Sequence, residues 1–307
     1  MISRRTLIDP RRKLPNLQQS SKHNARFDHD FLWGAASASQ HVEHQQPSDW
    51  TTFERQAINL GNTSTDTRPG YALPGHINSL DSVSANVRLK KTNFDFVFDE
   101  DFSLASKLGH NTHRFSICWA RLFPTRDSIT PAPEAIKFYH DILDSLEKYR
   151  ITPFVTLFHF SSPHWFWDET DGKRGWERED AIEHFEKFVH SVLDAYGDRI
   201  THWTTLNEPM TYIYNGYMQG IFPPLEKRDI NGVVTVIEQL LKAHAVAYKL
   251  IHDHANRKNL SAKVGIAKHT RTFQALRIWA PLDTISSKAV EQAFIWDFMD
   301  AINTGIL

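Results

Sequence analysis

The stretch Thr204-Thr205-Leu206-Asn207-Glu208-Pro209 decides how the rest of the chain is interpreted. The run 200–206 is rich in β-branched and aromatic residues and is bounded by turn residues, which predicts a short buried strand. Asn207 and Glu208 would then stand at its C-terminal end. Glutamate is unfavourable in strands and costly to bury unpaired, so its place before a proline indicates a site. The alternative is a polar strand end that caps the next helix, and the stretch alone leaves both interpretations open.

The composition is that of a globular protein with a large core. The 307 residues are 41% hydrophobic and 12% aromatic, enough for one large α/β domain or two smaller ones. Lys plus Arg (35) nearly balances Asp plus Glu (36), so no overall charge favours nucleic acid or an anionic membrane as a partner. Nine Trp and eight Tyr suit sugar faces as well as cores.

The single cysteine and the many histidines give no metal site. Cys118 has no intrachain disulfide partner and is interpreted as a small buried hydrophobe. Seventeen histidines raise a metal hypothesis, but they form no HExxH helix and have no set of cysteine partners. No Gly-rich phosphate loop follows any predicted strand. We therefore predict neither a metal nor another cofactor.

Residues 1–26 differ from the rest of the chain. They carry seven Lys and Arg residues among Pro, Ser, Gln and Asn, without an apolar run that suits a signal peptide, which predicts a solvated, disordered lead-in. No apolar run in the chain approaches the roughly 20 residues needed to span a bilayer. A cytoplasmic protein is the default expectation, with residues 27–307 as its folded part.

Ordered sequence is expected to begin at Phe31. Residues 31–39 read as a first strand whose small residues permit close backbone approach, and the polar residues Gln40, His41 and Glu43 follow it. This pattern fits the floor of a ligand site. Residues 61–86 are rich in Gly, Pro, Ser and Asp without periodicity, which predicts a long surface loop.

Beyond that loop, predicted helices and strands alternate. Their apolar spacing and end signals give helices at 93–108, 133–149, 180–196, 233–254 and 286–302, and strands at 111–119, 151–159, 200–206 and 263–269. Five consecutive βα units predict parallel strands with right-handed crossovers. The fold class is therefore α/β, either an open doubly wound sheet or part of an eight-stranded barrel, in which the C-terminal ends of the strands form the catalytic face.

Four motifs, in order along the chain, resemble glycoside hydrolase family 1, the β-glucosidases and their relatives. The resemblance covers roughly residues 27–307 and implies a (β/α)8 TIM barrel, incomplete, with about five βα units present. Residues 298–305 also resemble the family's helix before its sixth strand. The motifs are Phe31–Ser39, His113–Pro124, Thr156–Phe160 with Pro163 and Trp165, and Trp203 with Leu206–Pro209.

The resemblance implies hydrolysis of β-O-glycosidic bonds, in a small β-glycoside or oligosaccharide, with retention of configuration. Such chemistry needs one acid/base and one nucleophilic carboxylate, roughly 5 to 5.5 Å apart. Glu208 matches the acid/base, and Arg114 the residue that orients the nucleophile. Asn207 and His159 match sugar hydroxyl ligands. Trp203 and Phe160 are expected to form an apolar wall beside the proton donor.

The departures from the family pattern concern the sugar. His41 replaces the glutamine that clasps the sugar hydroxyls, unless Gln40 substitutes for it, so both are candidate substrate-binding residues. Phe160 replaces a tryptophan, and Cys118 replaces a strand glutamate. The sugar preference is therefore left open.

The nucleophile of the family lies in a Thr-Glu-Asn-Gly stretch, and no Glu of this chain is followed by Asn. We expect a barrel that lacks its C-terminal strands, exposes two strand edges and has poor solubility by itself. A retaining glycosidase of which this chain is a part is favoured, with little activity expected from the 307 residues alone. A non-catalytic sugar-binding relative is the alternative, and an inverting hydrolase using Glu43 or Asp66 has no motif in its favour.

Overall fold

The computed structural model describes residues 27–28, 30–44, 46–61, 91–167 and 174–305. The chain divides into two units, Met1–Leu32 and Trp33–Leu307, and the second holds all the named helices and strands. The predicted lead-in at 1–26, nearly all of the predicted loop at 61–86, and Asp66 lie outside the described residues.

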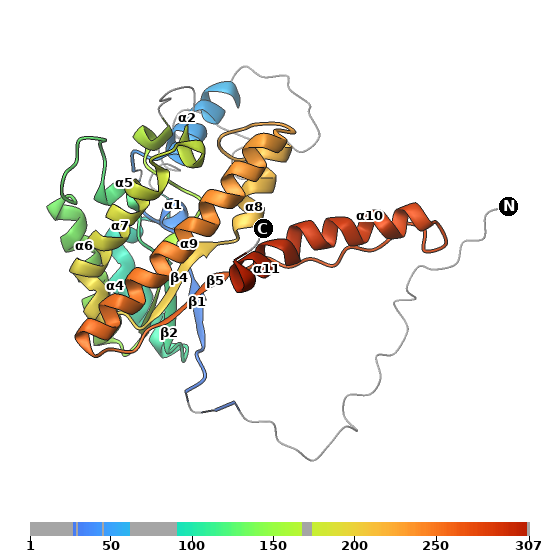
Figure 1. Ribbon diagram of the computed structural model, residues 1–307. Helices are drawn as coiled ribbons and strands as arrows, with labels where there is room; N and C mark the ends of the chain where they lie inside the picture. Colours follow the sequence, from blue (N-terminus) through green and yellow to red (C-terminus); the bar gives the residue numbers. More distant parts are fainter. Residues whose placement is uncertain (1–26, 29, 45, 62–90, 168–173, 306–307) are drawn as a thin grey trace, which may run out of the picture. The chain divides into compact units, whose positions relative to one another are not determined.

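Five parallel strands form one sheet, in which neighbours in space are also neighbours in sequence (Figure 1). A doubly wound sheet reverses its strand order at a switch point, so this order excludes that alternative and fits successive strands of a barrel. All five predicted strands are confirmed, with shorter bounds than the patterns gave. They are β1 (Gly34–Ala36), β2 (Thr112–Ser116), β3 (Thr152–Phe158), β4 (His202–Asn207) and β5 (Lys263–Ala267).

The small residues of β1 do allow close approach. A Cβ on Gly34 would lie 2.0 Å from the carbonyl oxygen of Thr112, its partner on β2, so only glycine fits there. Among the described residues, β1 and β5 each pair on one side only. All of β1 is exposed, and β5 is at most half-buried. These two strands are the open edges that the sequence predicted.

The helices follow the predicted alternation with several differences. Helix α2 and the short helices α1, α5 and α8 are additional to the predicted set. Helix α9 begins three residues early, where Asp229 accepts a 2.9 Å hydrogen bond from the Gly232 amide, and the last helical segment begins at Pro281. The helices are α1 (Ser39–Val42), α2 (Asp49–Gly61), α4 (Phe94–Lys107), α5 (Trp119–Leu122), α6 (Pro133–Lys148), α7 (Ala181–Tyr196), α8 (Pro209–Ile213), α9 (Ile230–Lys258), α10 (Pro281–Glu291) and α11 (Asp297–Thr304).

The core lies between the sheet and these helices, and its largest aromatic cluster surrounds Trp119. The indole of Trp119 contacts the rings of five residues, Trp165, Phe166, Trp176, Phe185 and Phe188. The prediction that both faces of β3 are covered is correct for Val155–Phe158 and wrong for Thr152–Phe154, which are half-buried. Among the described residues, no helix has the length and apolar character to cross a membrane.

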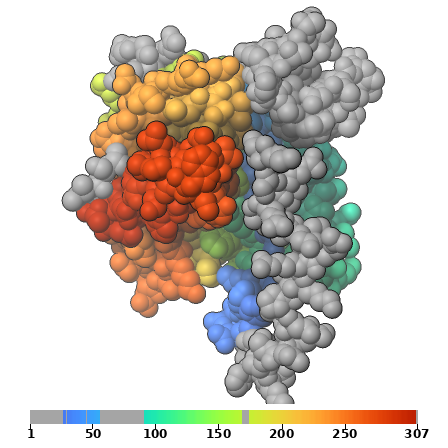
Figure 2. All heavy atoms as spheres, turned by 90° about the vertical axis from the view of Figure 1, so that its right-hand side faces the viewer, coloured from blue at the N-terminus to red at the C-terminus, as the bar shows by residue number. Residues whose placement is uncertain are grey.

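The C-terminal helical segment leaves apolar side chains uncovered. Leu282, Ile285 and Val290 of α10 are all exposed, Leu282 to 76%. Figure 2 shows this segment, in orange to red, on the face toward the viewer. Helix α11 packs against α9.

Candidate active site

Glu208 stands at the C-terminal end of β4 with both sides of its backbone fastened. Its amide donates to the carbonyl oxygen of Ala267 on β5 at 2.7 Å, and its own carbonyl oxygen accepts from the Thr211 amide of α8 at 2.9 Å. Its φ of 44° lies in the left-handed region, which costs a non-glycine residue on the order of 1–3 kcal/mol and often marks a functional position. The side chain is 36% exposed.

The alternative interpretation, a polar strand end that caps the next helix, is correct for the position of Glu208 but not for its side chain. Glu208 occupies the N-cap position of α8, but its side chain makes no capping hydrogen bond. The carboxylate is therefore available at the rim of the sheet for another role.

Arg114 joins three strands beside this carboxylate. Its Nε donates to Oγ1 of Thr156 on β3 at 2.8 Å, and its Nη2 donates to Oδ1 of Asn207 on β4 at 2.7 Å. Burial lowers the pKa of Arg114, and the negative charge of Glu208 opposes that shift. Arg114, Asn207 and Glu208 therefore form one electrostatic group, as expected for neighbouring strand ends.

His159, just beyond β3, does not behave as a satisfied core histidine. Its Nδ1 is buried and has no hydrogen-bond partner among the described residues. Burial lowers the pKa of His159 to about 3, with smaller contributions in the same direction from Arg114 and His41. The ring is therefore neutral near physiological pH, and since Nδ1 is shielded, a ligand can reach His159 only through the rest of its half-buried ring.

The two candidates on α1 are placed differently. Gln40 is buried, and its Oε1 accepts a 2.8 Å hydrogen bond from the hydroxyl of Ser48. His41 is exposed and acts electrostatically on His159. The structure thus brings His41 toward the site. The carboxamide of Gln40 is instead hydrogen-bonded to Ser48, just before α2.

Trp203, one of the two residues of the expected apolar wall, lies away from Glu208. Trp203 lies near the start of β4, where its indole N–H donates to the Ile200 carbonyl oxygen at 3.1 Å. It is five residues before Glu208, roughly 16 Å along a strand at about 3.3 Å per residue, so its assignment to the wall is wrong. Phe160 stacks on the ring of Tyr212, on the helix that follows Glu208.

Sequence reasoning missed His269. Its Nδ1 lies 3.2 Å from Oε2 of Glu208 and 2.9 Å from Oγ1 of Thr211. A signal was present, because the predicted strand 263–269 ends in polar residues and follows the Glu208 strand in the chain. Parallel strands bring such ends to one edge.

Glu43 belongs to a buried structural group. It accepts a 2.8 Å hydrogen bond from the Tyr139 hydroxyl, and its Oε2 lies 3.0 Å from Nε of Arg121, an ion pair without hydrogen-bond geometry. Burial raises the pKa of Glu43 to about 7, and Arg121 and the Tyr139 hydrogen bond counteract the shift. These contacts do not support Glu43 as the catalytic carboxylate of an inverting hydrolase.

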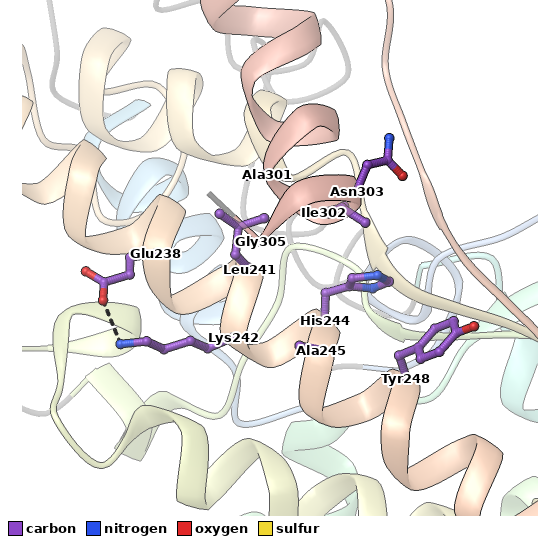
Figure 3. Close-up of a pocket in the computed structure, with 10 residues that line it drawn as sticks. All are labelled: Glu238, Leu241, Lys242, His244, Ala245, Tyr248, Ala301, Ile302, Asn303 and Gly305. Carbon is purple, nitrogen blue, oxygen red and sulfur yellow. Dashed lines mark ion pairs between the residues drawn. The ribbon is translucent and has the colours of Figure 1, made fainter. Parts of the chain in front are cut away.

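No metal centre competes with this site in the described part of the chain, where no three His, Cys, Asp or Glu side chains are grouped to hold an ion. Cys118 is 2% exposed and unbridged, as predicted for a small buried hydrophobe. A hollow of about 700 Å³ lies between α9 and α11 (Figure 3). Two charged residues that line this hollow, Glu238 and Lys242, form an ion pair with each other, so neither offers an unpaired charge to a ligand.

Comparisons with known proteins agree with this geometry. The sequence profile of glycosyl hydrolase family 1 matches residues 77–305. Over 255 residues the chain is 29% identical to a 1,4-beta-D-glucan glucohydrolase of Thermotoga neapolitana, covering 81% of this chain and 52% of that protein. It is also 29% identical over 288 residues to rat lactase/phlorizin hydrolase, covering 92% of this chain and 13% of that protein.

Among solved structures, the chain is similar to a beta-glycosidase from Pyrococcus horikoshii. The TM-score is 0.70 at 30% identity, and the match covers 90% of this chain and 56% of the other. The chain therefore spans about half the length of the Thermotoga and Pyrococcus proteins.

Proposed function

Because the chain belongs to glycosyl hydrolase family 1, and its sheet is part of that family's (β/α)8 barrel, we propose that the protein hydrolyses β-O-glycosidic bonds with retention of configuration. The substrate is a small β-glycoside or oligosaccharide. The observation that carries the proposal is the placement of Glu208, with a carboxylate that caps no helix and reaches solvent beside the Arg114–Asn207 pair.

Glu208 is the acid/base of the proposed reaction. It gives its proton to the glycosidic oxygen as the bond to the sugar breaks, while a nucleophilic carboxylate attacks the anomeric carbon from the other side. In the second step Glu208 takes a proton from the attacking water, and the carboxylate leaves. We assign the role of nucleophile to a carboxylate outside the described residues. Arg114 is the residue proposed to orient it.

Hydrogen-bonding capacity supports the sugar contacts. Oδ1 of Asn207 accepts from Arg114, so the amide hydrogens of Asn207 remain to donate to a sugar hydroxyl. The half-buried ring of His159 is a second contact. His41 is the exposed candidate on α1, whereas a sugar bound by Gln40 would have to replace its hydrogen bond with Ser48.

The test incubates the 307-residue chain with 4-nitrophenyl β-glucoside, with and without azide as a replacement nucleophile. The proposal predicts release of nitrophenol only with azide, together with a glycosyl azide product. Turnover without azide would show that the chain supplies its own nucleophile and would contradict this part of the proposal.

A second candidate function is sugar binding without catalysis. The observation in its favour is that no Glu of this sequence is followed by Asn, as the nucleophile motif of the family requires. Calorimetry with an aryl β-thioglucoside separates the two. Binding without turnover in either azide condition would favour the second function over the first.

A further inference from the structure

His269 lies against the carboxylate of Glu208 and against the helix that follows Glu208. Its Nδ1 is 3.2 Å from Oε2 of Glu208 and 2.9 Å from Oγ1 of Thr211, on α8. One ring nitrogen thus touches two side chains that stand three residues apart. His269 itself comes two residues after the end of β5.

Arg271 determines which nitrogen of this ring carries a proton. Its Nε–H donates to Nε2 of His269 at 3.2 Å, and a nitrogen that accepts a hydrogen bond must hold a lone pair. A neutral imidazole has one N–H, so the proton is on Nδ1. His269 therefore donates Nδ1–H to the Thr211 hydroxyl at 2.9 Å, and the same nitrogen lies 3.2 Å from Oε2 of Glu208 as a close polar contact.

Phe294 fixes the plane of the ring. The ring centroids of His269 and Phe294 are 5.9 Å apart at 85°, and the Arg271 guanidinium lies 5.3 Å over the same Phe294 ring. Aromatic packing and two hydrogen bonds together hold the imidazole in one orientation. A group held in this way can impose an orientation on the carboxylate that it touches.

We propose that His269 is a positioning residue for Glu208, whose Oε2 it holds so that Oε1 carries the transferable proton. The proposal rests on the proposed acid/base role of Glu208. Among the residues that the structure describes, no other hydrogen bond or ion pair reaches this carboxylate.

The contact also favours the reaction step itself. As the proton leaves Oε1 for the glycosidic oxygen, the electron pair of the broken bond goes to that oxygen and negative charge develops on Glu208. The positive end of a fixed N–H dipole, 3.2 Å from Oε2, stabilises this developing charge more than the neutral acid, which lowers the barrier. When Oε1 later takes a proton from water, the same contact returns to its initial state.

Nitrogen-15 spectra of the histidine rings test the arrangement without any turnover. In the neutral ring of His269 we expect the proton on Nδ1 and none on Nε2. Glu208→Gln should shift the Nδ1 resonance, and Arg271→Ala should populate both tautomers. His190, whose Nε2 lies 3.8 Å from Glu186 on the exposed face of α7, is the matched histidine and should not respond to Glu208→Gln. The proposal would be overturned by a His269 ring protonated on Nε2, or by an Nδ1 chemical shift that is the same in the parent and in Glu208→Gln.

The dependence of turnover on the leaving group tests the consequence. In azide, His269→Ala should lower turnover of 4-nitrophenyl β-glucoside roughly 10- to 100-fold and leave the 2,4-dinitrophenyl substrate, which needs little protonation, nearly unchanged. His269→Asn should restore much of the loss, because its amide N–H can stand near the place of Nδ1–H.

Comparison with Glu208→Gln separates two failures. Suppose that Glu208→Gln loses activity only on the 4-nitrophenyl substrate, whereas His269→Ala loses activity equally on both substrates or on neither. That result would overturn the positioning role of His269 and leave the acid/base role of Glu208 intact. No selective loss in Glu208→Gln would overturn the proposed function itself.

Discussion

Arg114 on β2 reaches across β3 to donate a 2.7 Å hydrogen bond to Oδ1 of Asn207 on β4. A second donor of the same guanidinium binds Thr156 on the intervening strand at 2.8 Å. The planar fork of arginine can serve two acceptors in fixed directions, whereas lysine offers one flexible ammonium group. This pair of contacts therefore fixes the amide of Asn207 next to Glu208.

Arg114→Lys should keep the charge and lose this fixed geometry. We expect a loss of about 1–3 kcal/mol in the free energy of unfolding and weaker binding of an aryl β-thioglucoside. Urea denaturation and calorimetry measure the two effects. Arg257→Lys, at an exposed position near the end of α9, is the control, and equal effects in both variants would refute the assignment.

Asp49, which begins α2, should make stability depend on pH. Burial raises the pKa of Asp49 from 3.8 to about 7, although the amides of Ser162 and Trp50 counteract the shift. Between these two values the folded state keeps a proton that the unfolded state has released. The contribution of Asp49 to the free energy of unfolding therefore falls as pH rises from 3.8 to about 7.

Asp49→Asn should remove this part of the pH dependence, up to roughly 4 kcal/mol at about 1.4 kcal/mol per pKa unit. Denaturation at a series of pH values gives the difference between variant and parent. Asp141→Asn, on the exposed side of α6, is the matched change. Parallel curves for the parent chain and Asp49→Asn would rule the explanation out.

His159 should remain neutral through the neutral pH range. Burial, Arg114 and His41 hold the pKa of His159 at about 3. The ring proton signals should therefore stay constant as the pH falls from neutral, until the pH approaches that value. An NMR titration with the resonance assigned through His159→Gln checks this. A midpoint near the ordinary histidine value of about 6.5 would show that the ring is solvated and not held as described.

The Trp119 cluster should carry a large share of stability. Trp119 is 2% exposed and surrounded by five aromatic rings, so Trp119→Ala should cost about 3–5 kcal/mol through lost burial and the cavity left behind. Trp279, 76% exposed, offers a tryptophan control whose change to alanine should cost far less. Similar losses in the two variants would contradict the assigned core.

Much of the fold was predictable because each βα unit has its own local pattern, and strand order follows once consecutive units are parallel. The placement of Glu208 followed from one strand end. The choice between Gln40 and His41 was not predictable, because neighbours on a helix point about 100° apart and only packing shows which one meets Ser48. Helix α2 was missed since its polar residues outnumber its apolar ones.

The error over Trp203 was avoidable, because its place five residues before Glu208 in the same predicted strand is visible in the sequence. The surroundings of Glu208 were less predictable: the register of β4 against β5 shifts between Thr204 and Asn207, so simple alternation along the strand does not give the face of every side chain. The contact of His269 with Glu208 likewise depends on Arg271 and Phe294, which act after the strand has ended.

The most direct test of the account is the rate of Glu208→Gln on two aryl β-glucosides in azide, with Glu186→Gln as the exposed control. If Glu208 donates the proton, the variant loses roughly 10²- to 10⁴-fold on 4-nitrophenyl β-glucoside and little on the 2,4-dinitrophenyl substrate. Equal rates of parent and variant on 4-nitrophenyl β-glucoside would contradict the account.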